Sequence, residues 1–287
     1  MTVVSNIIGG LGNQMFQYAA GYTLSKRTGQ ALKLHINDYS FINDRKFQLE
    51  SVFGLKANIA NATDIKKIIG NKGNLYSRKL FYKLGLSRNL LIEKPYVFNN
   101  FFFKVSDSVY LDGYWQNYNY FNEEKNNIRK LFTFTSLKSE ERESFFKNKN
   151  IKNSISVHIR KADYINKNKN SKIFFSLDNK YYLEAFNIMK LKVENPFFYI
   201  FSDDIEWVKN NITMESLDFT IVTPSLSPGK DMALMSKCRH HIIANSTFSW
   251  WAAWLNTSNE KIIVAPQKWL NVVKQPDGLN LPSWITI

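Results

Sequence analysis

The pattern of apolar and polar positions predicts an α/β chain whose second half is the more regular. Ile155, Val157 and Ile159 alternate with polar residues, as in a strand with one buried face. Further strands are expected at 197–202, 218–222, 240–244 and 261–264, separated by helices at 179–191, 204–211, 230–237 and 248–255. Strictly alternating strands and helices predict a parallel sheet with helices on both faces.

The first half opens with an apolar strand at 2–8, a glycine-rich turn that contains Gly10 and Gly12, and a helix expected from Met15. This order is typical of a loop that approaches an anion or a nucleotide. Met15 stands where the dinucleotide-binding pattern requires its third glycine, so that class is not indicated. A plain glycine turn is the alternative, but the amides of Asn13 and Gln14 at its exit can bind sugar hydroxyls.

Residues 147–150 are polar and rich in Asn and Lys, which is typical of a linker. We therefore expect two domains, residues 1–150 and residues 151–287.

Polar side chains gather where the strand at 154–160 ends, which is where open α/β sheets bind ligands. His158, Arg160 and Asp163 lie there. A guanidinium group suits bidentate contact with a phosphate, and Asp163 can orient that group or accept a proton. The alternative is an ordinary edge strand with solvated charges.

Two other strand ends carry polar groups. Asp203 follows the strand at 197–202, and an ionised carboxylate there can accept two hydrogen bonds from guanine. Helix capping is the alternative role for Asp203 and the adjacent Asp204. Both roles are possible together if Asp203 reads a base while Asp204 caps the next helix. Ser246, Thr247 and Ser249 open the helix after the strand at 240–244, which favours a phosphate site or, alternatively, routine capping.

Composition narrows the functional classes. The formal net charge is +14 and the pI is about 9.6, which suits polyanions, nucleotides or an anionic membrane surface. A single cysteine, Cys238, excludes an intrachain disulfide framework and is typical of a reducing compartment. We expect neither a signal peptide nor a membrane span, and no Cys/His cluster has metal-ligand spacing. A basic RNA-binding module is the alternative class, but the basic residues are spread along the chain and no RNA-binding signature occurs.

Taken together, these segments resemble glycosyltransferase family 11, the α-1,2-fucosyltransferases, in its bacterial branch. The matching stretches occur in family order at 9–17, 112–116, 158–164, 199–204, 231–236 and 245–251. The sequence departs from the family pattern at Lys161, where a second arginine is usual. A lysine keeps the positive charge but lacks the planar guanidinium fork. We therefore expect phosphate binding by Arg160 but not by Lys161.

The resemblance implies a GT-B fold, with two Rossmann-like domains facing a central cleft, and an inverting enzyme that needs no metal or cofactor. It implies that L-fucose moves from GDP-β-L-fucose to a galactose 2-hydroxyl of an oligosaccharide, in O-antigen or other surface polysaccharide synthesis. By the same resemblance, residues of the second domain hold the donor, and Gly10, Gly12 and Asn13 close the site. The donor residues so implied are His158, Arg160, Asp203, Ser246, Thr247 and Ser249.

Charge balance completes the expected mechanism. Arg160 and helix amides stabilise the departing GDP while the acceptor hydroxyl attacks the opposite face of the sugar. A general base is not essential if GDP leaves early, and Asp163 and Asp38 are the candidates. Another GDP-sugar or another linkage is the alternative activity. We expect a bacterial cytoplasmic enzyme with no nucleic-acid partner, and its basic surface allows peripheral contact with the inner membrane.

Overall fold

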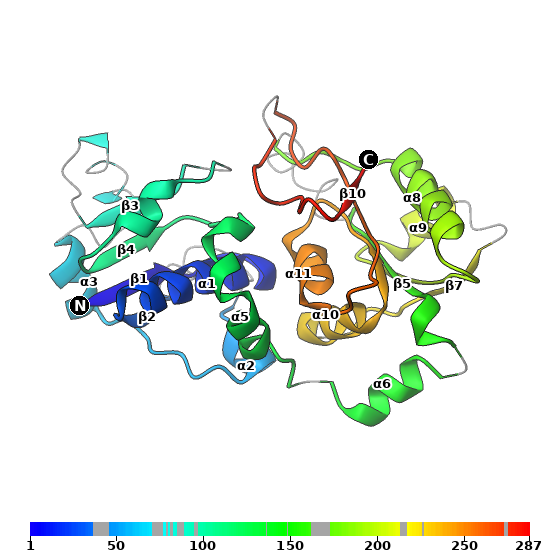
Figure 1. Ribbon diagram of the computed structural model, residues 1–287, viewed down its shortest axis with the longest axis horizontal. Coiled ribbons are helices and arrows are strands. Elements are labelled where there is room, and N and C mark those ends of the chain that lie inside the picture. The colour runs from blue at the N-terminus through cyan, green and yellow to red at the C-terminus, as the bar shows by residue number, and fades with distance from the viewer. Residues whose placement is uncertain are drawn as a thin grey trace. The chain divides into compact units, whose positions relative to one another are not determined.

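The structure is a computed structural model that describes residues 1–36, 46–70, 77–78, 80, 83–84, 89–94, 97–135, 137–147, 149–161, 173–212, 217–225, 227–272 and 275–287. Asp38 and Asp163, the two candidate bases, lie outside these residues. The chain divides into two compact units: Met1–Thr133 with Pro276–Leu279, and Phe134–Gln275 with Asn280–Ile287. Each unit is described by itself (Figure 1). The cleft expected between two domains stays a prediction.

The first unit is built on a parallel sheet in the order β2-β1-β4-β3. Its strands are β1 (Thr2–Asn6), β2 (Ala31–His35), β3 (Leu90–Ile92) and β4 (Val109–Asp112). Helix α1 (Leu11–Thr28) packs on β1 and β2. The shorter helices are α2 (Leu49–Phe53), α3 (Ala62–Ile69) and α5 (Lys125–Leu131), and the 3₁₀ turns are η2 (Asn100–Lys104), η3 (Tyr118–Tyr120) and η4 (Asn122–Glu124).

Helix α1 begins four residues earlier than the sequence predicted, at Leu11 rather than Met15. The Gly10 carbonyl accepts hydrogen bonds from the amides of Asn13 (2.9 Å) and Gln14 (3.1 Å), so part of the glycine turn is the first turn of the helix. The helix ends at Gly29, whose φ of 68° suits a residue without a Cβ. The predicted anion loop is therefore a helix N-terminus with extended Gly10 as its cap.

A segment near the C-terminus, Pro276–Leu279, packs on the first unit. The Asn117 amide group donates to the Asp277 carbonyl (2.8 Å), and the Tyr118 backbone N–H donates to the Gly278 carbonyl (3.1 Å). These bonds attach the segment to the loop that follows β4.

Gly278→Ala is expected to destabilise the first unit by about 2–4 kcal/mol, because two costs add. Gly278 has a φ of 72°, and an added Cβ would overlap the Asn117 side chain. Urea denaturation with Gly70→Ala as the control measures the effect, since the Gly70 φ is also positive (65°) but, within the part of the chain that the structure describes, an added Cβ there meets no other segment within 4 Å. Equal losses in the two variants would show that the contact with Asn117 contributes nothing.

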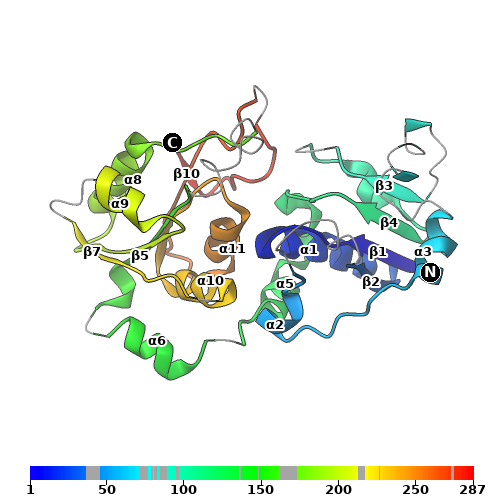
Figure 2. The ribbon, with the colours of Figure 1, turned by 180° about the vertical axis from the view of Figure 1, so that it is seen from behind.

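The second unit contains the parallel sheet that the alternating pattern predicted, in the order β10-β9-β8-β5-β6-β7. Its strands are β5 (Ser154–Ile159), β6 (Phe197–Ser202), β7 (Asp218–Ile221), β8 (His240–Ile242), β9 (Ile263–Ala265) and β10 (Ile285–Thr286). Its helices are α6 (Ser139–Phe145), η5 (Ile151–Asn153), α8 (Asn179–Lys192), α9 (Ile205–Asn211), α10 (Pro228–Lys237) and α11 (Thr247–Leu255). Helices α8 and α9 lie on one face of the sheet and α10 and α11 on the other, as both ribbon views show (Figures 1 and 2).

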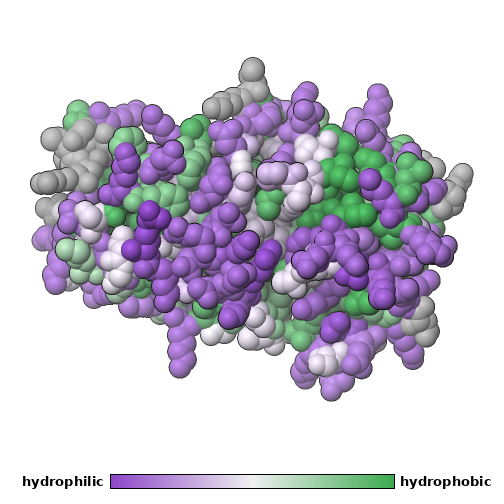
Figure 3. Space-filling model, viewed as in Figure 1, coloured by the Kyte–Doolittle hydropathy of each residue, from purple (hydrophilic) through white to green (hydrophobic). Residues whose placement is uncertain are grey.

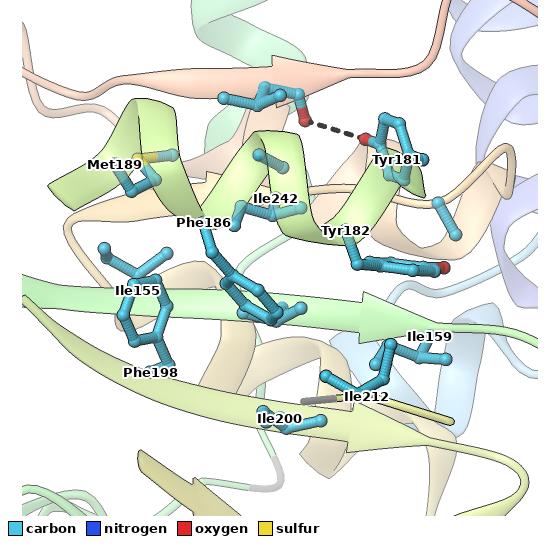
Figure 4. Close-up of a cluster of buried hydrophobic side chains, with 14 of the residues drawn as sticks. Ile155, Ile159, Tyr181, Tyr182, Phe186, Met189, Phe198, Ile200, Ile212 and Ile242 are labelled. Atoms are coloured by element: carbon cyan, nitrogen blue, oxygen red, sulfur yellow. Dashed lines mark hydrogen bonds between the residues drawn. The ribbon is translucent and has the colours of Figure 1, made fainter. Parts of the chain in front are cut away.

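The alternation along β5 assigns its side chains to these two faces. Ile155 and Ile159 belong to the apolar core under α8, together with Tyr182, Phe186 and Phe198 (Figure 4). Because β5 is buried on both faces, every residue of the strand is buried, including the polar ones.

Buried polar groups on the opposite face pair with one another. Ser156 Oγ lies 2.7 Å from His241 Nδ1, and His241 Nε2 lies 2.8 Å from the Asn256 amide nitrogen. Burial lowers the pKa of His241 well below its ordinary value, so this histidine is a neutral hydrogen-bonding group that joins β5, β8 and the end of α11.

The units divide at Thr133 and Phe134, before the boundary expected at residues 150 and 151. Helix α6 packs on the second unit: the Phe145 ring stacks on Tyr199 at 4.7 Å, and Glu141 forms an ion pair of 2.7 Å with Lys230. The polar stretch predicted as a linker therefore belongs to the second unit and does not separate the two units.

Candidate functional site

The second unit has a topological switch point between β5 and β8. From β5 the chain passes through α8 to β6 on one side, and α10 later leads to β8 on the other side. Open α/β sheets bind ligands outside the carboxyl ends of the two strands at such a point. Arg160 follows β5 directly, and residues 243–249 connect β8 to α11. The topology therefore brings two of the three predicted strand ends to one edge of the sheet.

His158 and Arg160 share the end of β5. His158 is buried, and its ring lies 5.6 Å from that of Phe248 on α11. Burial, and then the positive charge of Arg160, lower the pKa of His158 to about 3, so the imidazole is neutral at physiological pH. Its Nδ1 atom is buried and has no hydrogen-bond partner among the described residues. Such an atom is expected to pair with a water or a ligand.

Arg160 is half-buried at the same strand end. Its guanidinium group is the cation that the sequence assigned to phosphate, and the switch point is where such a group is useful.

Lys161 lies at the same strand end, but its ammonium group turns into the protein. The ammonium donates to the Leu177 carbonyl and lies 3.9 Å from the centre of the Trp207 ring. Burial lowers the pKa of Lys161, while the charges of Asp178 and Asp203 oppose that shift. Lys161 thus joins β5 to the start of α8 and to α9, a role that its sequence position did not reveal.

Lys161→Met is expected to lower the free energy of unfolding by about 1.5–3 kcal/mol, because a charged hydrogen bond is lost while the side-chain stem stays over Trp207. Urea denaturation measures the loss. Lys180→Met is the matched control on the exposed side of α8 and should change stability by less than about 0.5 kcal/mol. A Lys161→Met variant as stable as this control would contradict the structural role.

The acidic pair after β6 contains the helix cap that the sequence suggested. Asp204 caps α9 by accepting a hydrogen bond of 2.8 Å from the Trp207 N–H. Asp203 is exposed, and its Oδ1 atom accepts a hydrogen bond of 2.7 Å from the Lys161 N–H. This bond joins the ends of β5 and β6 and places the Asp203 carboxylate at the same edge of the sheet as Arg160. The base-reading role of Asp203 stays a prediction.

The three hydroxyl residues at α11 differ in their surroundings. Ser246 caps the helix, with its Oγ atom 3.3 Å from the Phe248 N–H, so the capping alternative describes it. Ser249 is fully buried and donates to the carbonyls of Ala244 and Ser246, both at 3.3 Å. Its hydroxyl group therefore supports the turn, while Thr247 is half-buried at the first position of the helix.

Asn245 is a site residue that sequence reasoning did not select. Its amide nitrogen donates to the carbonyls of Phe175 (2.6 Å) and Trp269 (2.9 Å). These bonds tie the end of β8 to the segments before α8 and after β9. Its position directly after a strand was the available signal, because that is where strand-end residues meet others from distant parts of the chain.

The first unit has its own switch point between β1 and β4. Gly10, Gly12 and Asn13 lie after β1, at the start of α1, and the Asn13 Oδ1 atom accepts a hydrogen bond of 3.0 Å from the Gln116 amide. Asn13 is half-buried, as the predicted contact with a ligand requires.

Gln14 does not fit the predicted contact with sugar hydroxyls. It is fully buried, donates to the carbonyls of Gly9 (3.0 Å) and Lys46 (2.9 Å), and accepts from the Gln48 N–H (2.9 Å). All these partners are backbone groups, so Gln14 supports the loop, and Asn13 is the accessible amide.

A buried ion pair supports the same strand ends. The Asp112 carboxylate accepts from Arg78 Nε (2.8 Å) and from the Asn6 amide (3.1 Å), and the Arg78 side chain is fully buried. The bond between Asn6 and Asp112 joins the last residues of β1 and β4, and the ion pair with Arg78 holds the same carboxylate. Asp112 is thus a structural residue within the stretch 112–116 that matches the family.

Comparison with known proteins shows relatives along the whole chain. A family model described as Glycosyl transferase family 11 matches residues 2–287. An alpha-1,2-colitosyltransferase of Escherichia coli is 36% identical over 274 residues, which cover 93% of this chain and 92% of the relative. The O-antigen biosynthesis glycosyltransferase WbnK of Escherichia coli is 33% identical over 302 residues, which cover 99% of each chain. Galactoside alpha-(1,2)-fucosyltransferase 2 of Sus scrofa is 25% identical, with 98% of this chain and 78% of the relative covered.

Solved structures share the fold. An Arabidopsis thaliana FUT1 mutant in complex with GDP has a TM-score of 0.54 at 13% identity, covering 98% of this chain and 72% of that chain. NodZ alpha-1,6-fucosyltransferase soaked with GDP-fucose has a TM-score of 0.51 at 14% identity, covering 88% of this chain and 92% of that chain. At these identities the likeness establishes an α/β fold with parallel sheets like that of GT-B-like fucosyltransferases.

Proposed function

We propose that this chain, which belongs to glycosyltransferase family 11, is an inverting enzyme that transfers L-fucose from GDP-β-L-fucose to a galactose 2-hydroxyl of a glycan. The observation that carries this proposal is the strand-end site of the second unit, with Arg160 beside the neutral, buried His158. A half-buried guanidinium group at a topological switch point suits the pyrophosphate of a nucleotide sugar. The names of relatives at 25% identity, and the GDP bound in structures of the same fold, support the choice of donor.

In the proposed mechanism the second unit stabilises the leaving group. Breaking the bond between fucose and phosphate leaves negative charge on GDP, which Arg160 and the N-terminal amides of α11 stabilise. Asp203 reads the guanine from the end of β6, and Thr247 holds the phosphate end of the site at the first turn of α11, which Ser246 caps. The sugar develops positive charge at its anomeric carbon, and the acceptor hydroxyl attacks from the opposite face. Transfer without a metal ion is part of this proposal.

Proton removal from the acceptor hydroxyl is the less defined step. Asp163 and Asp38 stay candidates outside the described residues, and Asn13 is a positioning group. If GDP leaves early, the hydroxyl group can lose its proton after the new bond has begun to form, so a strong base is not essential.

Colitose is the second candidate sugar, because the relative that is 36% identical is named as a colitosyltransferase. Colitose is L-fucose without its 3-hydroxyl group. A site that hydrogen-bonds this hydroxyl would favour fucose strongly, whereas a site that packs against carbon there would accept colitose.

A transfer assay tests the proposal. The protein is incubated in EDTA with GDP-L-fucose or GDP-colitose and a galactose-terminated oligosaccharide, and the product linkage is determined by NMR. An α-1,2-linked fucosyl product is expected. If only a colitosyl product forms, the donor is GDP-colitose and not GDP-fucose. If the linkage is not α-1,2, the proposed acceptor hydroxyl is wrong.

The biological setting follows as a further part of the proposal: O-antigen or related polysaccharide synthesis in a bacterial cytoplasm, with peripheral contact at the inner membrane. The relative WbnK carries O-antigen biosynthesis in its name. Among the described residues, no helix has both the length and the apolar character of a membrane span. Most of the face seen in Figure 3 is polar, with apolar side chains gathered on the second unit around α8. Binding to anionic vesicles that salt abolishes would support peripheral contact.

A further inference from the structure

A half-buried carboxylate in the first unit, Glu93, is used by neither the donor site nor the proposed chemistry. Glu93 follows β3, and its N–H extends the pairing with β4 by donating to the Asp112 carbonyl (2.9 Å). Its Oε2 atom accepts two backbone hydrogen bonds from the loop after β4, from Tyr114 (2.7 Å) and Trp115 (2.8 Å). One carboxylate oxygen thus binds two successive peptide groups.

The loop that Glu93 binds has a strained backbone. Trp115 has a φ of 54°, a region that large side chains rarely adopt, and its ring is fully buried against Phe102 and Tyr120. A Cβ at Gly113 would overlap the Glu93 side chain, so the loop passes directly over this carboxylate. Such a conformation persists only where the surroundings fix it, and the two hydrogen bonds to Glu93 do so here.

Fixing Trp115 also fixes the next residue, Gln116. The Gln116 amide donates to Asn13 Oδ1 at 3.0 Å, and both residues are half-buried. This pair joins the loop after β4 to the first turn of α1, at the switch point of the first sheet. Amide groups held at a fixed spacing can donate to and accept from neighbouring hydroxyl groups of a sugar.

We propose that Glu93 is a positioning residue that holds Gln116, and through it Asn13, in the geometry that binds hydroxyl groups of the acceptor glycan. This inference rests on the proposed function, which supplies the acceptor. It assigns the acceptor end of the reaction to the strand ends of the first unit.

The hold of Glu93 on the loop is expected to depend on pH, because its carboxyl group titrates near neutral pH. Burial raises the pKa of Glu93 to about 7, although the N–H groups of the loop oppose the shift by favouring the ionised form. Burial, and to a smaller extent the charge of Glu93, raise the pKa of the nearby Tyr120 to about 12, and the carboxylate of Asp112 on the adjacent strand is paired with Arg78. We therefore expect Glu93 to change charge near neutral pH, and its hydrogen bonds to the loop to weaken on protonation.

Two consequences of this titration have opposite signs. Acceptor affinity should fall as the pH drops below about 7, because the neutral carboxyl group holds the loop less firmly. Fold stability should move the other way. Since the pKa is raised from 4.5 to about 7, the contribution of Glu93 to stability is fully present below about pH 4.5 and is lost as the pH rises through 7.

The test measures binding of lactose, a galactose-terminated disaccharide, by saturation-transfer NMR in the presence of GDP, so that no turnover is needed. Glu93→Ala and Gln116→Ala are each expected to weaken lactose binding about tenfold or more. Glu93→Gln keeps an oxygen that can accept the two N–H groups but carries no charge, so at pH 8 it should bind lactose as the wild type does below pH 7, and it should lose the pH dependence. Glu123→Gln, an exposed position on η4, is the matched control and should change neither.

Titration with GDP separates this inference from the proposed function. GDP affinity should be unchanged in every variant, because the donor site lies in the second unit. Wild-type lactose affinity in Gln116→Ala and Glu93→Ala would overturn the positioning role. So would Glu93→Gln with the pH dependence of the wild type, even if Glu93→Ala fails to fold. Failure of the wild type to bind GDP would count against the proposed donor site alone.

Discussion

Arg160→Ala is expected to reduce fucose transfer about 10²–10³-fold while leaving the protein folded. The guanidinium group follows β5 at the switch point and is the cation that we assign to the leaving pyrophosphate. Removing a group that stabilises developing charge costs about 3–4 kcal/mol of transition-state free energy, which corresponds to this loss of rate. The measurement is kcat/KM for GDP-fucose, together with thermal unfolding to verify the fold.

Two further variants sharpen this experiment. Arg160→Lys keeps the charge but loses the fork, so partial activity well below wild type is expected. Arg142→Ala removes an exposed arginine from α6 in the same unit and should leave transfer unchanged. Near-normal turnover by a folded Arg160→Ala variant would remove Arg160 from the mechanism.

Asp112→Ala is expected to have the largest effect on stability, a loss of about 3–5 kcal/mol in the free energy of unfolding. The Arg78 side chain is fully buried, and its Nε atom donates to Asp112 at 2.8 Å. Without this carboxylate the buried guanidinium group loses a charged partner, and the Asn6 amide loses an acceptor. Urea denaturation of the variant and the wild type at one pH measures the difference.

A double variant separates the cost of a broken pair from the value of the intact one. Replacing both partners with apolar residues, Arg78→Met with Asp112→Leu, removes the buried charge altogether. The double variant should therefore be more stable than Asp112→Ala. A double variant that loses as much as the two single changes combined would show that the partners act independently.

Much of the second unit could be predicted from the sequence because its signals are local. The apolar alternation around Val157 located β5, and repeated strands and helices implied a parallel sheet. In such a sheet all strands end at the same edge, so the convergence of Arg160 and Asp203 followed from topology alone. The capping by Asp204 could also be predicted, because it joins residues three apart.

The contacts that could not be predicted join distant parts of the chain. Lys161 and Gln14 both occur in motifs that suggest ligand binding, yet their partners are protein groups on other segments: Leu177 and Trp207 for Lys161, and the Lys46 carbonyl for Gln14. Glu93 gave no signal in sequence, because its role depends on a loop more than 20 positions away that folds over it. A polar residue beside a motif therefore becomes a ligand group or a support only through tertiary packing.

The start of helix α1 was also predicted too late, because the helix begins inside the glycine-rich turn. The glycine run at the start of α1 looked like a loop, because glycine disfavours helices, but Gly12 lies within the first turn of the helix. Packing of α1 on β1 outweighs this propensity.

Calorimetric titration with GDP, UDP and ADP in EDTA, on the wild type and on Arg160→Ala, tests the central claim most directly. The account predicts that the wild type prefers GDP over UDP and ADP without a metal ion. It also predicts that Arg160→Ala loses at least about tenfold in GDP affinity, as expected for a lost charge-assisted contact. Equal affinity for the three nucleotides, or unchanged GDP binding by Arg160→Ala, would contradict the assignment of the donor site to the strand ends of the second unit.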